Sequence, residues 1–196
     1  MEDRLARLLD RFPCLLLFGA RQTGKSTLVS KGKIAAGRKY VTFDDPEVIA
    51  AARRDAEAFL GQAPRLTVDE VQRYSDLFLR VKRSIDRERE LGRFLLTGSS
   101  AAEIVAAGKA SALAGRSAIL ELGPLTLGEI EGRESIDWLG LLRAPDATTA
   151  LRALPAPKTS RANLKRRIMR GGLPPAWEAQ DDESWREWMK IMTISG

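Results

Sequence analysis

The segment GARQTGKS constrains the fold of this chain more than any other feature of the sequence. It fits the spacing G-x-x-x-x-G-K-[ST], with Gly19, Gly24, Lys25 and Ser26 at the defining positions. Glycines let a loop curl until several backbone N–H groups face one anion, and a following helix turns its positive end toward the same point. The apolar run CLLLF just before it is typical of a buried parallel strand. The segment therefore predicts a phosphate-binding loop between a strand and a helix.

Within this loop, two side chains have expected roles. Lys25 would reach the β- and γ-phosphates of a nucleotide, and the Ser26 hydroxyl would bind magnesium. A glycine-rich turn without a ligand is the alternative, but the strand–helix context favours binding. The predicted nucleotide-contact residues are Gly19, Ala20, Arg21, Gln22, Thr23, Gly24, Lys25, Ser26 and Thr27.

An acidic pair ends a later apolar segment, RLTVDE. Asp69 at the end of such a strand can hold magnesium, and Glu70 beside it can orient or deprotonate the attacking water. An acid pair that only caps a strand is the alternative, and the upstream phosphate loop favours the functional interpretation.

The polar end of the segment FLLTGSS is a third candidate site. Thr97, Ser99 and Ser100 follow an apolar strand, and ligands of parallel sheets bind at the carboxyl ends of strands. We expect Ser99 or Thr97 to detect the γ-phosphate or to position water. Ordinary turn chemistry is the alternative, since Thr, Gly and Ser favour turns.

Alternating strand and helix patterns predict an α/β fold with helices on both faces of a parallel sheet. The expected strands are residues 14–18, 39–45, 65–69, 93–98 and 116–122, and the expected helices are 2–11, 25–35, 46–60 and 75–90. The strand at 39–45 lies between the phosphate loop and the strand that ends at Asp69. This extra strand, together with Glu70 beside Asp69, favours the ATPase branch of phosphate-loop proteins. The guanine-reading Asn-Lys-x-Asp motif is absent, so we expect ATP rather than GTP.

The pattern changes after Gly123. Residues 126–143 look helical, and residues 144–160 hold three prolines and many small residues, as in a loose linker. Helices are expected near 160–170 and 181–192. We therefore predict a nucleotide-binding domain at 1–125 and a helical extension at 126–196.

Composition excludes several classes of protein. The 196 residues include no histidine, which rules out histidine-based triads and zinc sites, and one cysteine, Cys14, which reads as a buried thiol. No run approaches the roughly 20 apolar residues of a membrane span, and the charged N-terminus lacks the apolar core of a secretory signal. We expect a cytoplasmic protein that does not enter a membrane.

The net charge of +6 comes from one segment. Residues 147–177 contain seven basic residues and no acid, which leaves 25 basic and 26 acidic residues elsewhere. Such a segment can contact nucleic-acid phosphates, or it can be a solvated face or pair with acids of another domain. Only Trp177 adds an aromatic ring to it.

Several motifs occur in one order: LLLFGARQTGKSTL, YVTFDDPEVIAAARRDAEAFL, LTVDEVQR, FLLTGSSA, SALAGRSAILELGPLTLGEI and RGGLPPA. Together they resemble a large, mostly uncharacterised prokaryotic family of AAA-type ATPases. The resemblance implies a sheet of order 5-1-4-3-2, ATP and Mg²⁺ as ligands, and ATP hydrolysis. It also implies that Arg116 in LAGR is an arginine finger or a sensor, with a structural ion pair as the alternative.

Members of that family usually continue into a further domain. We expect this chain to be a shortened copy that keeps nucleotide binding and loses any activity that needs the further domain. One hypothesis is an ATPase that couples hydrolysis to conformational change, with a homo-oligomer or a partner protein as its expected assembly. The other is a nucleotide-gated binding module with little turnover.

Overall fold

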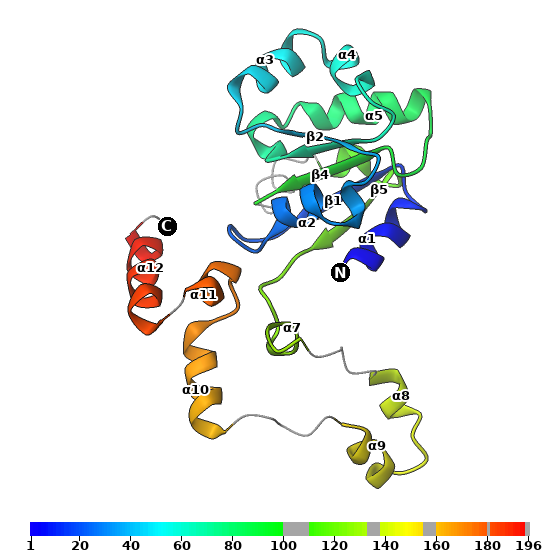
Figure 1. The fold of residues 1–196 in the computed structure, drawn as a ribbon. Helices are drawn as coiled ribbons and strands as arrows, with labels where there is room; N and C mark the ends of the chain where they lie inside the picture. The colour runs from blue at the N-terminus through cyan, green and yellow to red at the C-terminus, as the bar shows by residue number, and fades with distance from the viewer. Residues whose placement is uncertain (100–109, 133–137, 155–159, 180, 195–196) are drawn as a thin grey trace. The chain divides into compact units, whose positions relative to one another are not determined.

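The computed structural model describes residues 1–99, 110–132, 138–154, 160–179 and 181–194. The chain forms two compact units, Met1–Gly123 and Pro124–Gly196. In the first unit, the described strands form one five-stranded sheet in the order β2-β3-β4-β1-β5, and every pairing is parallel (Figure 1). The strands are β1 (Cys14–Phe18), β2 (Lys39–Thr42), β3 (Leu66–Asp69), β4 (Phe94–Gly98) and β5 (Ser117–Glu121). This order confirms the predicted α/β sheet of order 5-1-4-3-2.

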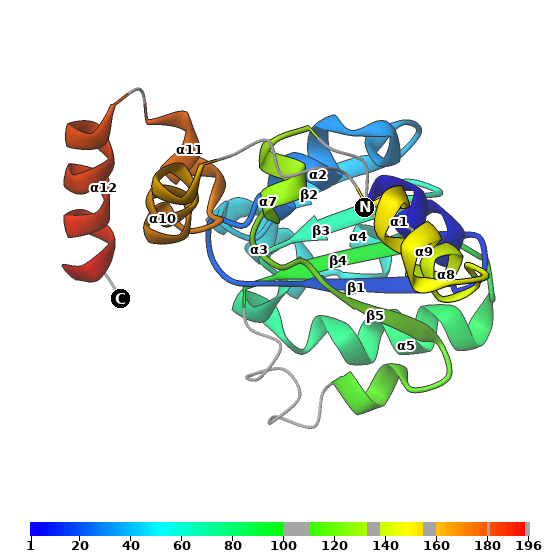
Figure 2. The same cartoon turned by 90° about the horizontal axis from the view of Figure 1, so that it is seen from below.

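Helices cover both faces of this sheet, as Figures 1 and 2 show. One face carries α1 (Glu2–Leu9) and α2 (Lys25–Lys31), and the other carries α5 (Leu77–Arg87). The remaining elements of the unit are α3 (Pro46–Arg54), α4 (Ala56–Gly61) and the short 3₁₀ turns η1 (Lys33–Ala35), η2 (Val71–Tyr74) and η3 (Ala110–Leu113).

Strand β1 is buried on both sides. Leu15 and Leu17 pack in the hydrophobic cluster beneath α1 and α2, whereas Leu16 and Phe18 pack in the cluster beneath α5. Side chains of a strand alternate between its faces, so a continuous apolar run is what a central parallel strand requires. Cys14 is fully buried in the second cluster, which confirms the expected buried thiol.

Two predicted helices of this unit are interrupted. The helix expected at 46–60 is two helices, because Asp55 adopts an extended backbone (φ −147°) and its carboxylate accepts hydrogen bonds from the N–H groups that begin α4. The helix expected at 25–35 ends at Lys31, since Gly32 is extended. Polar caps and glycine outweighed the helical periodicity at both points.

The described part of the second unit is helical. Its helices are α7 (Leu127–Ile130), α8 (Trp138–Leu142), α9 (Ala147–Ala153), α10 (Arg161–Arg170), α11 (Pro174–Glu178) and α12 (Asp182–Ile194). The helix expected at 126–143 is not continuous, because α7 ends before Gly132, which has a φ of +63°. The loose linker expected at 144–160 contains α9, whose N-terminus is capped by the Asp146 carboxylate.

The GGLPP motif joins parts of this second unit. The Leu125 N–H donates a 2.7 Å hydrogen bond to the Gly172 carbonyl. A Cβ atom on Gly172 would collide with the Leu125 carbonyl oxygen, so the close approach requires glycine. Arg170 donates to the carbonyls of Ala176 and Ala179, and its guanidinium stacks on Trp177. Across the described residues, none of the helices has both the length and the apolar character that a membrane crossing needs.

Candidate functional site

The phosphate-type loop lies between β1 and α2, as its spacing predicts. Gln22 and Gly24 have left-handed backbone angles (φ 62° and 92°), which give the loop its curl. A Cβ atom on Gly19 would collide with the carbonyl oxygen of Leu122, at the end of β5, so only glycine fits there. The Thr23 hydroxyl donates a 2.9 Å hydrogen bond to the Ala20 carbonyl across the loop. A hydrogen bond between two of its own residues, from the Thr23 side chain to the Ala20 backbone, therefore helps to hold the curl.

Lys25 is turned back into this loop. Its side chain is buried, with 4% of the residue exposed, and its Nζ donates 2.8 Å hydrogen bonds to the carbonyls of Gly19 and Ala20. Burial lowers the pKa of the ammonium group, while the carboxylates of Glu70 and Asp69 act in the opposite direction. A cation close to an anion-binding loop can neutralise phosphate charge without a large rearrangement.

The other predicted loop residues lie around this lysine. Ala20, Arg21 and Gln22 are exposed on the loop, and Ser26 and Thr27 are exposed in the first turn of α2. The backbone and the Ser26 hydroxyl are thus open to a ligand.

Asp69 ends β3 next to this lysine and accepts hydrogen bonds at both carboxylate oxygens. The Thr97 hydroxyl and the Glu70 N–H donate to Oδ1, and the Tyr40 hydroxyl donates a 2.7 Å bond to Oδ2. Burial, together with the hydrogen bond to Asp69, raises the pKa of the Tyr40 phenol far above its ordinary value, which keeps the phenol a donor. Asp69 itself is almost fully buried. These three donors fix the orientation of its carboxylate.

Glu70 and Ser99 share one donor. The Gln72 side-chain Nε2 donates to Glu70 Oε2 and also donates a 3.1 Å hydrogen bond to Ser99 Oγ. Glu70 has a left-handed backbone (φ 55°, ψ 41°), which is uncommon for a residue other than glycine and turns the chain sharply after β3. Glutamine therefore links the acid after β3 to the hydroxyl after β4.

The structure thus brings most predicted site residues to the carboxyl edge of the sheet. Strand register explains the arrangement: Leu17 pairs with Thr97, and Val68 pairs with Leu96, so β1, β3 and β4 end side by side. Ser100, the last residue of the polar segment, lies outside the described residues.

Arg116 lies elsewhere. It precedes β5, and Cys14 and Ser117 pair at the start of their strands, so Arg116 lies at the amino edge of the sheet. The length of β1, about 13 Å, separates that edge from the loop. Its guanidinium pairs with Asp86 on α5 and donates to the Ala114 carbonyl. A sensor role within one molecule does not fit this placement, whereas the ion pair does, and a role toward a second molecule stays a prediction.

Two residues of this site escaped the sequence interpretation. Tyr40 lies on β2 and Gln72 in the turn after β3, and neither belongs to a spacing rule for phosphate or metal sites. Tyr40 lies near Asp69 because Thr42 pairs with Asp69 and Tyr40 shares a strand face with Thr42, and this register is visible only in the structure. The only sequence signal for Gln72 was its position two residues after Glu70.

Comparison with known proteins agrees with this geometry. The family model described as an AAA domain matches residues 11–131. Uncharacterized proteins of Mycobacterium bovis and Mycobacterium tuberculosis are each 32% identical over 187 residues. The match covers 94% of this chain and 35% of each relative, so the chain spans about a third of the length of the curated relatives it matches. The chain belongs to this AAA-domain family of nucleotide-binding, ATPase-like proteins.

Proposed function

We propose that the chain binds ATP with Mg²⁺ and hydrolyses it to ADP and phosphate, and that hydrolysis drives a conformational change. The observation that carries this proposal is the hydrogen-bonded set at the carboxyl edge of the sheet. It holds a buried lysine, an oriented aspartate and a glutamate linked to a serine hydroxyl within one site. The nucleotide-binding domain extends to about residue 125, within the family match.

The loop suits a triphosphate. Gly19 leaves no room for a side chain beside the Leu122 carbonyl, so the start of the loop packs directly against the backbone that follows β5. Lys25 would exchange its bonds to the Gly19 and Ala20 carbonyls for phosphate oxygens, which carry full negative charge. The amine needs little movement, because it already lies within the curl of the loop.

The donor set also suits Mg²⁺. This ion takes one or two protein oxygens, with phosphate oxygens and waters as its other ligands. The Ser26 hydroxyl and the Asp69 carboxylate are oxygens of the required kind, and Asp69 is held in place by Tyr40 and Thr97. When bound, Mg²⁺ would neutralise charge that develops on the β- and γ-phosphate oxygens.

Glu70 is the residue that we assign to the attacking water. Its carboxylate accepts the water proton, and Gln72 fixes one carboxylate oxygen so that the other faces the reaction. Ser99 is joined to the same glutamine and would contact the γ-phosphate. Thr97 donates to Asp69, so its role is to orient the magnesium ligand rather than to touch phosphate.

The test separates binding from turnover. A fluorescent ATP analogue measures binding, and phosphate release measures hydrolysis. Lys25→Ala should lose both, whereas Glu70→Gln should bind normally and lose turnover. Lys31→Ala, an exposed lysine of the same helix, is the matched control and should lose neither. Turnover that survives in both Lys25→Ala and Glu70→Gln contradicts an ATPase at this site.

A nucleotide-gated binding module with little turnover is the second candidate. The observation that favours it is the resting geometry of Lys25, whose Nζ donates to carbonyls of its own loop. In the basic segment, Arg167 pairs with Glu131 and Arg170 bonds backbone carbonyls, while Lys158 lies outside the described residues. Exposed charges such as Lys165 remain for a nucleic-acid partner. Tight ATP binding without single-turnover hydrolysis would select this candidate.

A further inference from the structure

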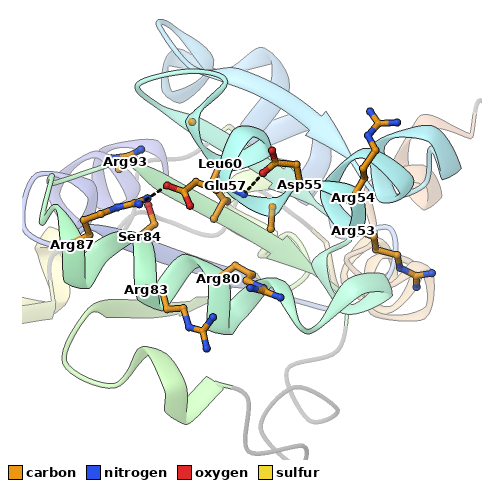
Figure 3. A pocket seen from close by; sticks show the side chains of 12 residues that line it. Arg53, Arg54, Asp55, Glu57, Leu60, Arg80, Arg83, Ser84, Arg87 and Arg93 are labelled. Atoms are coloured by element: carbon orange, nitrogen blue, oxygen red, sulfur yellow. Dashed lines mark hydrogen bonds and ion pairs between the residues drawn. The ribbon is translucent and has the colours of Figure 1, made fainter.

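A hollow of about 690 Å³ lies beside α5 (Figure 3). Its walls come from the end of α3, from α4, from α5 and from the residue before β4. It shares no lining residue with the nucleotide site. The charged residues that line it are Arg53, Arg54, Asp55, Glu57, Arg80, Arg83, Arg87 and Arg93. Six arginines against two acids make this the site of a concentrated positive charge.

Three of these arginines lie along one helix. Arg80, Arg83 and Arg87 are spaced three and four residues apart, so they share one face of α5. Arg53 and Arg54 end α3 on the opposite wall, and Figure 3 shows them projecting in different directions at the rim. The sequence alone did not reveal this cluster, because its members are spread over residues 53–93 and each local segment also contains acids.

Some of the arginines already have partners. Arg87 pairs with Glu57, and the guanidinium of Arg93 lies near the Glu88 and Glu90 carboxylates. Arg53 lies over the ring of Tyr74. Asp55 is engaged too, because its carboxylate caps α4.

The other three arginines are exposed and make no ion pair or hydrogen bond within the described residues: Arg54, Arg80 and Arg83. Of the two acids in the lining, Glu57 pairs with Arg87, and Asp55 accepts hydrogen bonds from backbone N–H groups. The positive charge of these three guanidinium groups is therefore available to a ligand. A guanidinium presents a planar set of donors that matches phosphate oxygens.

The arrangement favours an extended anion. The guanidinium groups of Arg54, Arg80 and Arg83 point in different directions and do not converge on one point (Figure 3). Along α5, seven residues separate Arg80 from Arg87, a distance of about 10 Å at the helical rise, which exceeds the size of one phosphate group. None of the twelve residues of the lining is aromatic, so the hollow offers no surface on which a base could stack.

We propose that this hollow binds the phosphate backbone of a nucleic acid without reading its sequence. Arg54, Arg80 and Arg83 supply the contacts, since Arg87 and Arg93 are already paired with carboxylates. Phosphate contacts of this kind give affinity and position but carry no base information. The site is independent of the proposed hydrolysis, and it differs from the basic segment at 147–177.

The test is fluorescence anisotropy with labelled single-stranded and duplex DNA of one sequence, over a range of salt concentrations. The triple variant Arg54→Gln, Arg80→Gln, Arg83→Gln should bind at least about tenfold more weakly. Its slope of log affinity against log salt on duplex DNA should fall by about 2 to 3, because each lost phosphate contact contributes about 0.9. Scrambled sequences should bind the wild-type chain equally.

The matched control removes three charges from α10: Arg161→Gln, Lys165→Gln, Arg166→Gln. It should keep most of the affinity, and both triple variants should bind the fluorescent ATP analogue normally, which shows that they fold. Loss of DNA affinity in the α10 variant alone assigns binding to the basic segment and overturns the proposal. No DNA binding by the wild type, or displacement by polyglutamate as effective as by DNA, overturns it also. Displacement by free tripolyphosphate at equal phosphate concentration would identify a small phosphate ligand instead of a nucleic acid.

Discussion

The Tyr40 hydroxyl donates a 2.7 Å hydrogen bond to Oδ2 of Asp69, which ties the edge strand of the sheet to the acid at the end of β3. This bond makes a first prediction. Tyr40→Phe should raise the Mg²⁺ concentration needed for half-maximal turnover by about tenfold, because the carboxylate loses an orienting donor. Nucleotide binding without Mg²⁺ should not change. Tyr74→Phe is the control, since the Tyr74 ring packs against Phe43, whereas the phenol that donates to Asp69 is that of Tyr40. An unaltered Mg²⁺ dependence in Tyr40→Phe would show that Thr97 and the backbone suffice.

Gln72 provides a second prediction. Gln72→Ala should lower turnover by about tenfold, or 1.4 kcal/mol of barrier, because Glu70 is no longer held toward the water. The ATP affinity of Gln72→Ala should stay the same. Gln62→Ala, which changes an exposed glutamine after α4, is the control and should keep its turnover. In a Glu70→Gln background, Gln72→Ala should have no further effect on turnover. Independent losses that add in the double variant would mean that Gln72 acts through another group, such as Ser99.

Gly19 provides a third prediction, about stability. Gly19→Ala places a methyl group against the Leu122 carbonyl, so the free energy of unfolding should fall by about 1 to 3 kcal/mol and nucleotide binding should weaken. Gly61→Ala is the matched control and should not lose stability, because a Cβ atom there meets no neighbour within 4 Å. Chemical denaturation of both variants measures the difference. Equal stabilities would show that the loop and β5 can move apart at little cost.

Cys14 gives a fourth prediction, about pH. Burial raises the pKa of its thiol well above the ordinary 9.0, so the native chain keeps a proton that the unfolded chain loses. This contribution to stability is fully present below pH 9.0 and is lost as pH rises, at up to about 1.4 kcal/mol per pH unit. The difference in unfolding free energy between wild type and Cys14→Ala should therefore shrink above pH 9.0. Parallel pH curves for the two proteins would refute this. Thiol reagents should label Cys14 only after unfolding.

Arg116 gives a fifth prediction. It lies across the sheet from the loop of its own chain, so we expect it to act on the site of a second molecule. Arg116→Ala and Glu70→Gln should each be inactive alone and should regain part of the turnover when mixed. Asp86→Asn removes the partner of Arg116 but leaves the guanidinium, so its turnover should persist. A mixture that stays inactive assigns Arg116 to its ion pair with Asp86.

The sequence predicted the sheet well because β1 is a continuous apolar run and β4 begins with one, and a central parallel strand is the structure that buries such runs on both faces. The phosphate loop and the acid pair were equally accessible, since local spacing defines them. Helix ends were less accessible. Asp55 sits within a helical pattern, and only its extended backbone reveals that it starts a new helix.

What the sequence could not supply was contact between distant segments. Tyr40 reaches Asp69, and Gln72 reaches Ser99, only because the order β2-β3-β4 places those strands side by side. For Arg116 the sequence suggested a contact that the fold does not make within one chain. Its motif indicated phosphate chemistry, but the topology places it at the amino edge of the sheet, opposite the phosphate loop. Pairing register decides such contacts, and one chain without its fold does not reveal register.

The alternation along β1 also determines how this chain would tolerate change. Leu15 and Leu16 are neighbours in sequence, yet they belong to hydrophobic clusters on opposite faces of the sheet. A smaller side chain at one of these positions leaves a cavity in the layer that it faces, and the packing of the other layer is contributed by the other leucine. A second substitution that restores the packing lost at one of these leucines must therefore lie in the same layer, on α1 for Leu15 or on α5 for Leu16, and not at the next residue along the chain.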